Sequence, residues 1–150
     1  MEVAGAELCS PLPRRWAHTQ GVAERAIEVR EVLGAGAGLL HAAATLHDVG
    51  YAPRLAEHSF ALLEAEERGL REELATEFPL LDEPLLVDAL VYCDMTTTPD
   101  GDRSTAQDRV AEIRSRYVDD SLVGRFIRRA APEIFASVER VEAALTAQPR

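Results

Sequence analysis

The dipeptide His47-Asp48 stands at the end of a nearly all-apolar segment that begins at Leu39. An ionised carboxylate on a helix that is apolar around most of its circumference is costly unless it is paired. A metal ion compensates this cost, because it takes an imidazole nitrogen and a carboxylate oxygen together. Two further ligand types occur elsewhere, His18 upstream and Asp94 downstream. The spacing therefore predicts one metal ion held by His18, His47, Asp48 and Asp94.

The predicted ligand set determines the kind of ion and the kind of chemistry. Two neutral imidazoles and two carboxylates cancel the charge of a divalent ion, and this mixture of nitrogen and oxygen favours a transition metal over calcium. Neighbouring helical residues such as His47 and Asp48 point about 100° apart, so they share one ion only near a helix end, which Gly50 provides. Coordination positions beyond four would hold water and a substrate oxygen, the arrangement for hydrolysis. The identity of the ion stays open among manganese, iron, cobalt, nickel, zinc and magnesium.

The elements that position these residues are predicted to be helices. Apolar residues recur at helical spacing, and sustained alternation of the strand type is absent. Before the His-Asp pair, we expect an irregular arm over 1–13, a helix over 14–33, a glycine-rich turn over 34–38 and a central buried helix over 39–49. After it, we expect one or two helices over 55–78, a helix from Pro84 to about Asp94 and a polar loop over 96–103. Three further helices are expected: one to Tyr117 that is capped by Ser104 with Gln107, one that is capped by 119–121, and a last one that starts at Pro132.

Length and composition fit a single all-α domain of about six to seven helices over residues 1–150. The chain has 150 residues, and hydrophobic residues make up 47% of it, which is enough for a sizeable core. No linker or internal repeat divides it. The glycine-rich turn lacks a preceding strand and a lysine, so it is not interpreted as a phosphate-binding loop.

Charge and cysteine usage narrow the partners and the compartment. The net charge of −10 argues against nonspecific nucleic-acid binding, which rests on phosphate neutralisation. No apolar run is long enough to cross a bilayer, and the first ten residues lack the basic residues of a signal peptide. Two cysteines do not form a disulfide framework. We expect a cytoplasmic protein that contacts neither nucleic acid nor membrane.

The order of a lone histidine, a His-Asp pair and a distant aspartate resembles the HD-domain superfamily of metal-dependent phosphohydrolases. The segment Leu46-His47-Asp48-Val49-Gly50-Tyr51 is close to the signature of that family, and the resemblance covers the chain from about His18 to Asp94. It implies an all-helical fold and makes His18, His47, Asp48 and Asp94 the metal ligands.

The segment from Tyr92 to Gly101 resembles a narrower bacterial subgroup of HD proteins. In that subgroup, a further helical segment with another histidine follows the turn at 51–53. Here Ala56-Glu57-His58-Ser59 follows almost at once, so the chain resembles a shortened version in which His58 stands where the later histidine would resume. The missing piece would normally form one wall of the site.

The resemblance implies attack of a metal-activated water on phosphorus. Asp48 would ligate the ion and orient the water, and His58 or Glu57 would act as general acid or as a partner of a ligand. Arg54 is the first candidate for a phosphate contact, because a guanidinium binds phosphate through two hydrogen bonds. The weaker candidates for substrate contacts are Arg14, Arg15 and Thr96.

The sequence therefore predicts a phosphohydrolase that acts on a nucleotide or another small phosphorylated ligand. The alternative is a binding or regulatory module that keeps the fold and the metal but has lost activity with the shortened segment. A homo-oligomer in which a neighbouring chain supplies the missing wall is a third hypothesis.

Overall fold

The computed structural model describes residues 13–47, 69, 72, 76 and 83–148, and most of these residues are helical with no strand among them. The predicted all-α class is confirmed. The helices expected over 55–78 fall almost entirely outside the described residues. Within the described part of the chain, no helix is long and apolar enough to cross a membrane.

The first half of the described chain consists of α2 (Pro13–Glu28), α3 (Arg30–Leu33), the short 3-10 helix η1 (Gly34–Gly36) and α4 (Ala37–Leu46). The expected single helix over 14–33 is therefore interrupted, at Val29, where the backbone leaves the helical region. The glycine-rich turn is shorter than expected, and α4 begins within it. Gly34 has a φ of 52°, a left-handed conformation that favours glycine.

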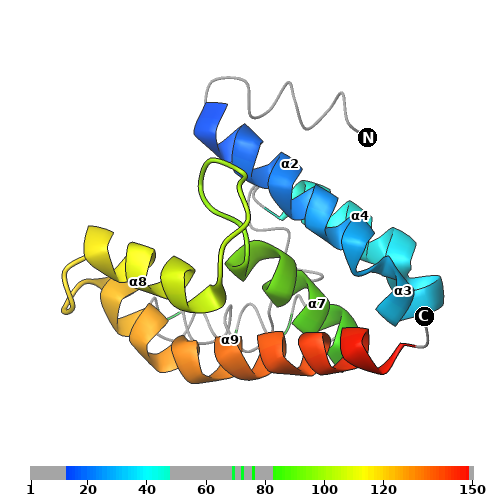
Figure 1. The fold of residues 1–150 in the computed structure, drawn as a ribbon. Coiled ribbons are helices and arrows are strands. Elements are labelled where there is room, and N and C mark those ends of the chain that lie inside the picture. The colour runs from blue at the N-terminus through cyan, green and yellow to red at the C-terminus, as the bar shows by residue number, and fades with distance from the viewer. Residues whose placement is uncertain (1–12, 48–68, 70–71, 73–75, 77–82, 149–150) are drawn as a thin grey trace.

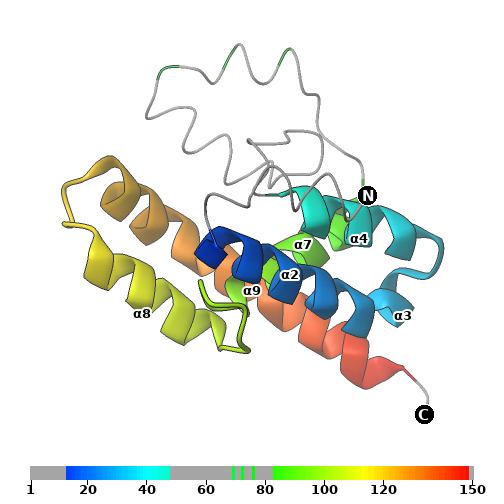
Figure 2. The same cartoon turned by 90° about the horizontal axis from the view of Figure 1, so that it is seen from above.

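The second half consists of α7 (Pro84–Met95), α8 (Ala106–Arg116) and α9 (Leu122–Ala147). Among the described helices, α7 is the central one, since it contacts α2, α4, α8 and α9 (Figure 1). The expectation that the helix over 39–49 is the central buried one was wrong for the described helices: Leu39 on α4 keeps 46% of its surface exposed. Figure 1 shows α2 and α4 above α7, and Figure 2 shows the same two helices from above.

The prediction that a helix starts at Pro132 was wrong, because α9 runs through this proline without ending. Proline removes one backbone hydrogen bond from a helix interior. Here the apolar stripe continues across it: the buried residues of α9 on both sides are Gly124, Ile127, Ala130, Ile134, Ser137, Val138 and Val141. Burial of one continuous face outweighs the local cost of the proline.

The cap of α8 also differs from the prediction by one residue. Thr105, rather than Ser104, is the N-cap, and its hydroxyl accepts a hydrogen bond from the backbone N–H of Asp108 at 3.1 Å. The backbone N–H of Ser104 already donates to the carbonyl of Thr96 at 2.9 Å. A capping box needs that N–H for the side chain three residues later, so the cap moves to Thr105.

Two apolar clusters share α7. The first joins α7 to α2, α4 and the end of α9 through buried residues that include Val22, Leu40 and Val141. The second joins α7 to α8 and the first part of α9 through residues that include Met95, Val110 and Ile127. The end of α7 that carries Asp94 is therefore fixed from both sides.

An ion pair between a buried carboxylate and a half-exposed guanidinium ties α7 to α9. Asp88 on α7 is 7% exposed, and both of its carboxylate oxygens accept hydrogen bonds from Arg140 on α9, each at 2.7 Å. Arg140 also contacts Ser137 and the exposed Glu133. A carboxylate this buried requires its partner, because an unpaired charge in the interior is strongly destabilising.

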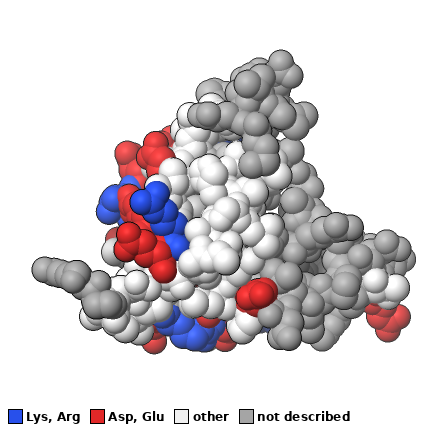
Figure 3. All heavy atoms as spheres, turned by 90° about the vertical axis from the view of Figure 1, so that its right-hand side faces the viewer, with Lys and Arg blue, Asp and Glu red and all other residues white. Residues whose placement is uncertain are grey.

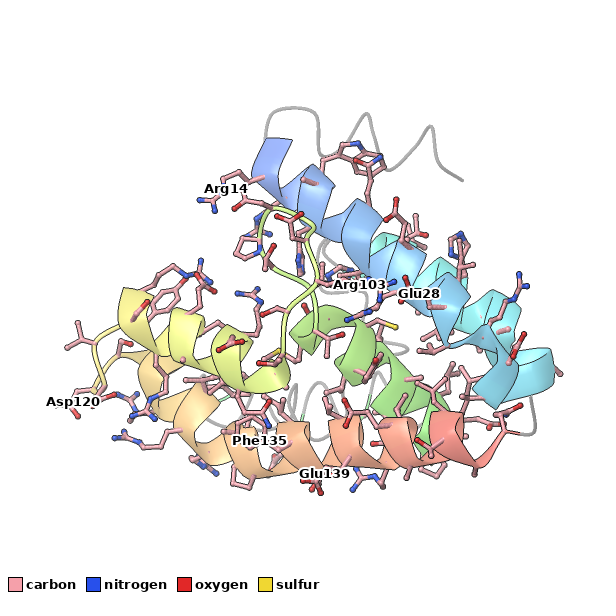
Figure 4. The ribbon with its side chains drawn as sticks, in the orientation of Figure 1. Arg14, Glu28, Arg103, Asp120, Phe135 and Glu139 are labelled. Carbon is pink, nitrogen blue, oxygen red and sulfur yellow. The ribbon has the colours of Figure 1, made fainter. Side chains whose placement is uncertain are left out.

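The loop over 96–103 lies against α2 at a point where both backbones carry glycine. A Cβ on Gly21 would collide with the carbonyl of Gly101 and would come within 2.8 Å of Thr97 Cγ2. Gly101 has a φ of 89°, and a Cβ there would meet the carbonyl of Ala17. Ion pairs hold the same loop from outside: Arg103 contacts Glu28, as Figure 4 shows, and Arg14 contacts Asp100.

On the face shown in Figure 3, uncharged residues form a broad area and charged side chains gather at its edge. The exposed large apolar residues of the described chain are Ile27, Leu39, Tyr117 and Val118.

We expect Arg140→Met to lower the free energy of unfolding by about 2–4 kcal/mol, because Asp88 then stays buried without its partner. Glu133→Gln removes only the exposed arm of the same network, so it should change that free energy by less than ~1 kcal/mol. Urea denaturation of the two variants measures the difference. Equal effects would contradict the role assigned to Asp88.

We expect Gly21→Ala to lower the free energy of unfolding by about 1–3 kcal/mol, because its methyl group forces the loop away from α2. The control is Gly38→Ala on α4, where a Cβ meets no atom within 4 Å. Alanine has the higher helix propensity, so this control should be neutral or stabilising by up to ~1 kcal/mol. Thermal and urea unfolding of both variants test the close approach, and a tolerated alanine at position 21 would exclude it.

Candidate metal centre

Three helices bring a cluster of potential ligands together. His18 lies in α2, His47 directly follows α4, and Asp94 lies in the last turn of α7. One ligand atom from each residue can be chosen so that all three atoms lie within 4.8 Å of one another. Contacts of α2 with α4, and of α7 with both, produce this convergence. Three of the four predicted ligands are therefore adjacent, although they come from positions far apart in the sequence.

The ring of His18 is held at both nitrogens. The side chain is buried, Nδ1 lies 2.9 Å from the carbonyl oxygen of Thr98, and Nε2 lies 3.0 Å from Asp94 Oδ1. A carbonyl only accepts hydrogen bonds, so Nδ1 carries a proton. An ionised carboxylate also only accepts, so either a second proton or a metal ion must lie between Nε2 and Asp94 Oδ1.

His47 repeats this arrangement at the end of α4. Its Nδ1 lies 2.7 Å from the carbonyl oxygen of Ala44, one turn earlier, so this nitrogen also carries a proton. The neutral ring then has its lone pair on Nε2. The His18 and His47 rings meet edge to face, with centroids 5.3 Å apart. A backbone carbonyl that fixes the tautomer of a histidine is one of the common partners of a metal-binding imidazole.

Asp94 is ionised at neutral pH. Burial raises its pKa, but the hydrogen bond with His18 and the charges of His47, His18 and Arg109 outweigh burial and bring the pKa to about 2. The side chain keeps 32% of its surface exposed, so the carboxylate is not sealed inside the protein. A charged, partly accessible oxygen beside two imidazoles suits a divalent cation.

The donor set fits a divalent ion. Ligand atoms about 2.1 Å from a transition metal stand about 3.0 Å apart when they subtend a right angle. The distance of 3.0 Å between His18 Nε2 and Asp94 Oδ1 agrees with that spacing. Two nitrogens and one carboxylate favour manganese, iron, cobalt, nickel or zinc over calcium.

Cys93 does not add a thiolate to this set. Its side chain is fully buried, and burial raises the pKa of the thiol to about 12. A metal ligand would have to be the thiolate, which this environment disfavours. The candidate centre is therefore one of nitrogen and oxygen donors.

Three of the other predicted site residues, Asp48, Arg54 and His58, lie outside the described residues. Arg14 is exposed and forms two hydrogen bonds with Asp100, at 2.7 and 2.8 Å, and Arg15 is exposed.

Thr96 is part of the framework that holds the loop. It is 4% exposed, its hydroxyl donates to the carbonyl of Tyr92 at 2.6 Å, and Arg25 Nε donates to the same hydroxyl at 3.1 Å. The guanidinium of Arg25 also lies over the ring of Tyr92. Arg25 thus fixes the segment between Asp94 and Thr98, both of which contact His18.

Sequence reasoning did not identify the two carbonyls that orient the imidazoles, nor Arg25 and Arg109. Backbone carbonyls of Ala44 and Thr98 leave no trace in residue type. The arginines belong to no motif, and only the packing of α8 and α2 against α7 brings them near Asp94. A signal for Arg25 exists in retrospect, since it lies seven residues after His18 and thus on the same face of α2.

Comparisons with known proteins do not assign the chain to a family: no family model, no curated protein and no solved structure matches it.

Proposed function

We propose that this chain is a metal-dependent phosphohydrolase of the HD-domain type, which binds one divalent ion and hydrolyses a nucleotide or another small phosphate ester. The observation that carries the proposal is the convergence of His18, His47 and Asp94 at the ends of three helices. The sequence order of these ligands, with Asp48 directly after His47, supports the family, and the backbone partners of both imidazoles support a metal.

In this proposal each residue has a defined task. His18 and His47 present Nε2 lone pairs, because their Nδ1 atoms donate to carbonyls. Asp94 supplies negative charge at neutral pH, and Asp48 supplies a second carboxylate. An ion held there would lower the pKa of a coordinated water and offset the charge of a phosphoryl group. The roles of His58 as general acid and of Arg54 as phosphate contact belong to the same proposal.

The second candidate is a module of the same fold that binds a metal or a ligand without turnover. Two observations favour it: the Arg14 guanidinium is already paired with Asp100, and Thr96 is buried beneath Arg25. These two predicted substrate contacts are thus engaged within the protein. The second candidate shares the metal centre with the first and differs from it in activity.

Metal content is the first test. We expect about one equivalent of a divalent transition metal in the purified wild type and little in His47→Ala or Asp94→Asn, because each variant removes one of three converging ligands. His41→Ala is the matched control, since His41 lies on α4 but outside the cluster. Elemental analysis of the four proteins measures this. Equal metal content in all four, or none in the wild type, would contradict a metal centre.

Phosphate release from a panel of small nucleotides then separates the two candidates. Turnover by the wild type and His41→Ala that disappears with the metal in His47→Ala supports the phosphohydrolase. Stoichiometric metal without turnover across the panel supports the binding module.

A further inference from the structure

Arg25 is a largely buried arginine of α2 that contacts the segment directly after Asp94. Its side chain is 12% exposed. Nε donates to the hydroxyl of Thr96 at 3.1 Å, and Nη2 lies 3.5 Å from the carbonyl oxygen of the same residue. The central carbon of the guanidinium lies 5.6 Å from the centre of the Tyr92 ring. One side chain thus ties α2 to the last turn of α7.

Ion pairs extend this contact to the far end of the loop over 96–103. Arg25 Nη1 donates to one carboxylate oxygen of Glu28 at 3.0 Å, and the other oxygen of Glu28 contacts Arg103 (Figure 4). Arg103 pairs with Thr97 in an isolated antiparallel bridge, so the two ends of the loop lie side by side. Arg25 therefore holds the first residue of the loop directly, and it shares a carboxylate with the last.

The two partners of the His18 ring lie on either side of Thr96 in the sequence. Asp94 precedes Thr96 by two residues, the carbonyl of Thr98 follows it by two, and both contact the imidazole. The Thr98 carbonyl also accepts a hydrogen bond from the backbone N–H of Gly101 at 3.0 Å, so the loop fixes its direction. A displacement of Thr96 would therefore move both partners of the imidazole.

We propose that Arg25 is a positioning residue that sets the affinity of the candidate centre for its metal ion. It acts through Thr96 on the two partners of the His18 ring. The inference rests on the proposed function and deepens it, because it adds to the ligands a residue that determines their alignment. Side chains that orient ligands raise metal affinity, since the ion then meets donor atoms that are already held in place.

The experiment is a calorimetric titration of the chelator-treated protein with Co²⁺. We expect Arg25→Met to raise the dissociation constant about tenfold, because methionine keeps an apolar stem but has no donor for Thr96. The matched control is Arg103→Met, which removes the outer cation of the same network at a position that is 72% exposed. This control should change the dissociation constant less than about twofold. An unchanged constant in Arg25→Met, or equal changes in the two variants, would overturn the proposal.

A second variant shows whether the effect passes through Thr96. Thr96→Val keeps the size of the side chain and removes the hydroxyl that Arg25 contacts, so it should also weaken Co²⁺ binding about tenfold. Adding Arg25→Met to Thr96→Val should then cost less than about threefold, whereas independent effects would multiply to about a hundredfold. Multiplied effects would contradict the route through Thr96. If Arg25→Met does not fold, unchanged affinity in Thr96→Val overturns the proposal by itself.

Proton NMR of the chelator-treated protein measures the positioning of His18 without a metal. The Nδ1–H of His18 donates to the Thr98 carbonyl, and a hydrogen-bonded proton exchanges slowly with water. This proton, assigned by its absence in His18→Asn, should exchange several times faster in Arg25→Met and at the wild-type rate in Arg103→Met. An unchanged rate in Arg25→Met would overturn the proposal.

The two measurements separate this inference from the proposed function. Wild type that binds no Co²⁺ refutes the proposed metal enzyme. Faster exchange of the His18 proton in Arg25→Met would still support the positioning role in that case, because this readout needs no metal. Wild type that binds Co²⁺ as tightly as Arg25→Met would keep the metal centre and refute the role of Arg25.

Discussion

The position of the His18 ring is the constraint on which the candidate site depends. One imidazole contacts the carbonyl of Thr98 and the carboxylate of Asp94, and so it joins α2 to the end of α7 and to the loop that follows. The close approach of Gly21 and Gly101 permits this geometry, because bulkier residues would hold the loop away from α2. Arg25 fixes the intervening Thr96. The fold therefore orients His18 through several independent contacts rather than through one.

Part of the site follows from residue type and order alone. His18, His47 and Asp94 were predicted to converge, and the structure brings them together because each lies in or next to a helix that packs on the others. Arg14 and Thr96 show the limit of such reasoning. Both lie near the predicted ligands, but their polar groups are engaged by Asp100 and Arg25, and pairing of this kind depends on the tertiary arrangement.

The fold was predictable to the same extent, and its prediction failed in places for the same physical reason. Helical periodicity predicted the all-α class, and the suitability of proline for a first helical turn predicted the start of α7 at Pro84. Local signals misplaced the elements where a longer-range contact opposed them. Pro132 indicates a helix start by itself, yet a continuous buried face carries α9 through it. Ser104 is a good cap by type, but its N–H is donated to Thr96, so Thr105 takes that place.

The ends of α4 and α7 have a consequence that does not depend on their side chains. Both helices point their carboxyl ends toward the cluster: α4 ends at Leu46, directly before His47, and α7 ends at Met95, directly after Asp94. The carboxyl end of a helix carries roughly half a negative charge from its aligned peptide dipoles. The backbone thus creates a negative potential at the place where these ends meet. Replacement of all the ligand residues would weaken this field without abolishing it. The architecture itself therefore favours the acquisition of cation sites at this position.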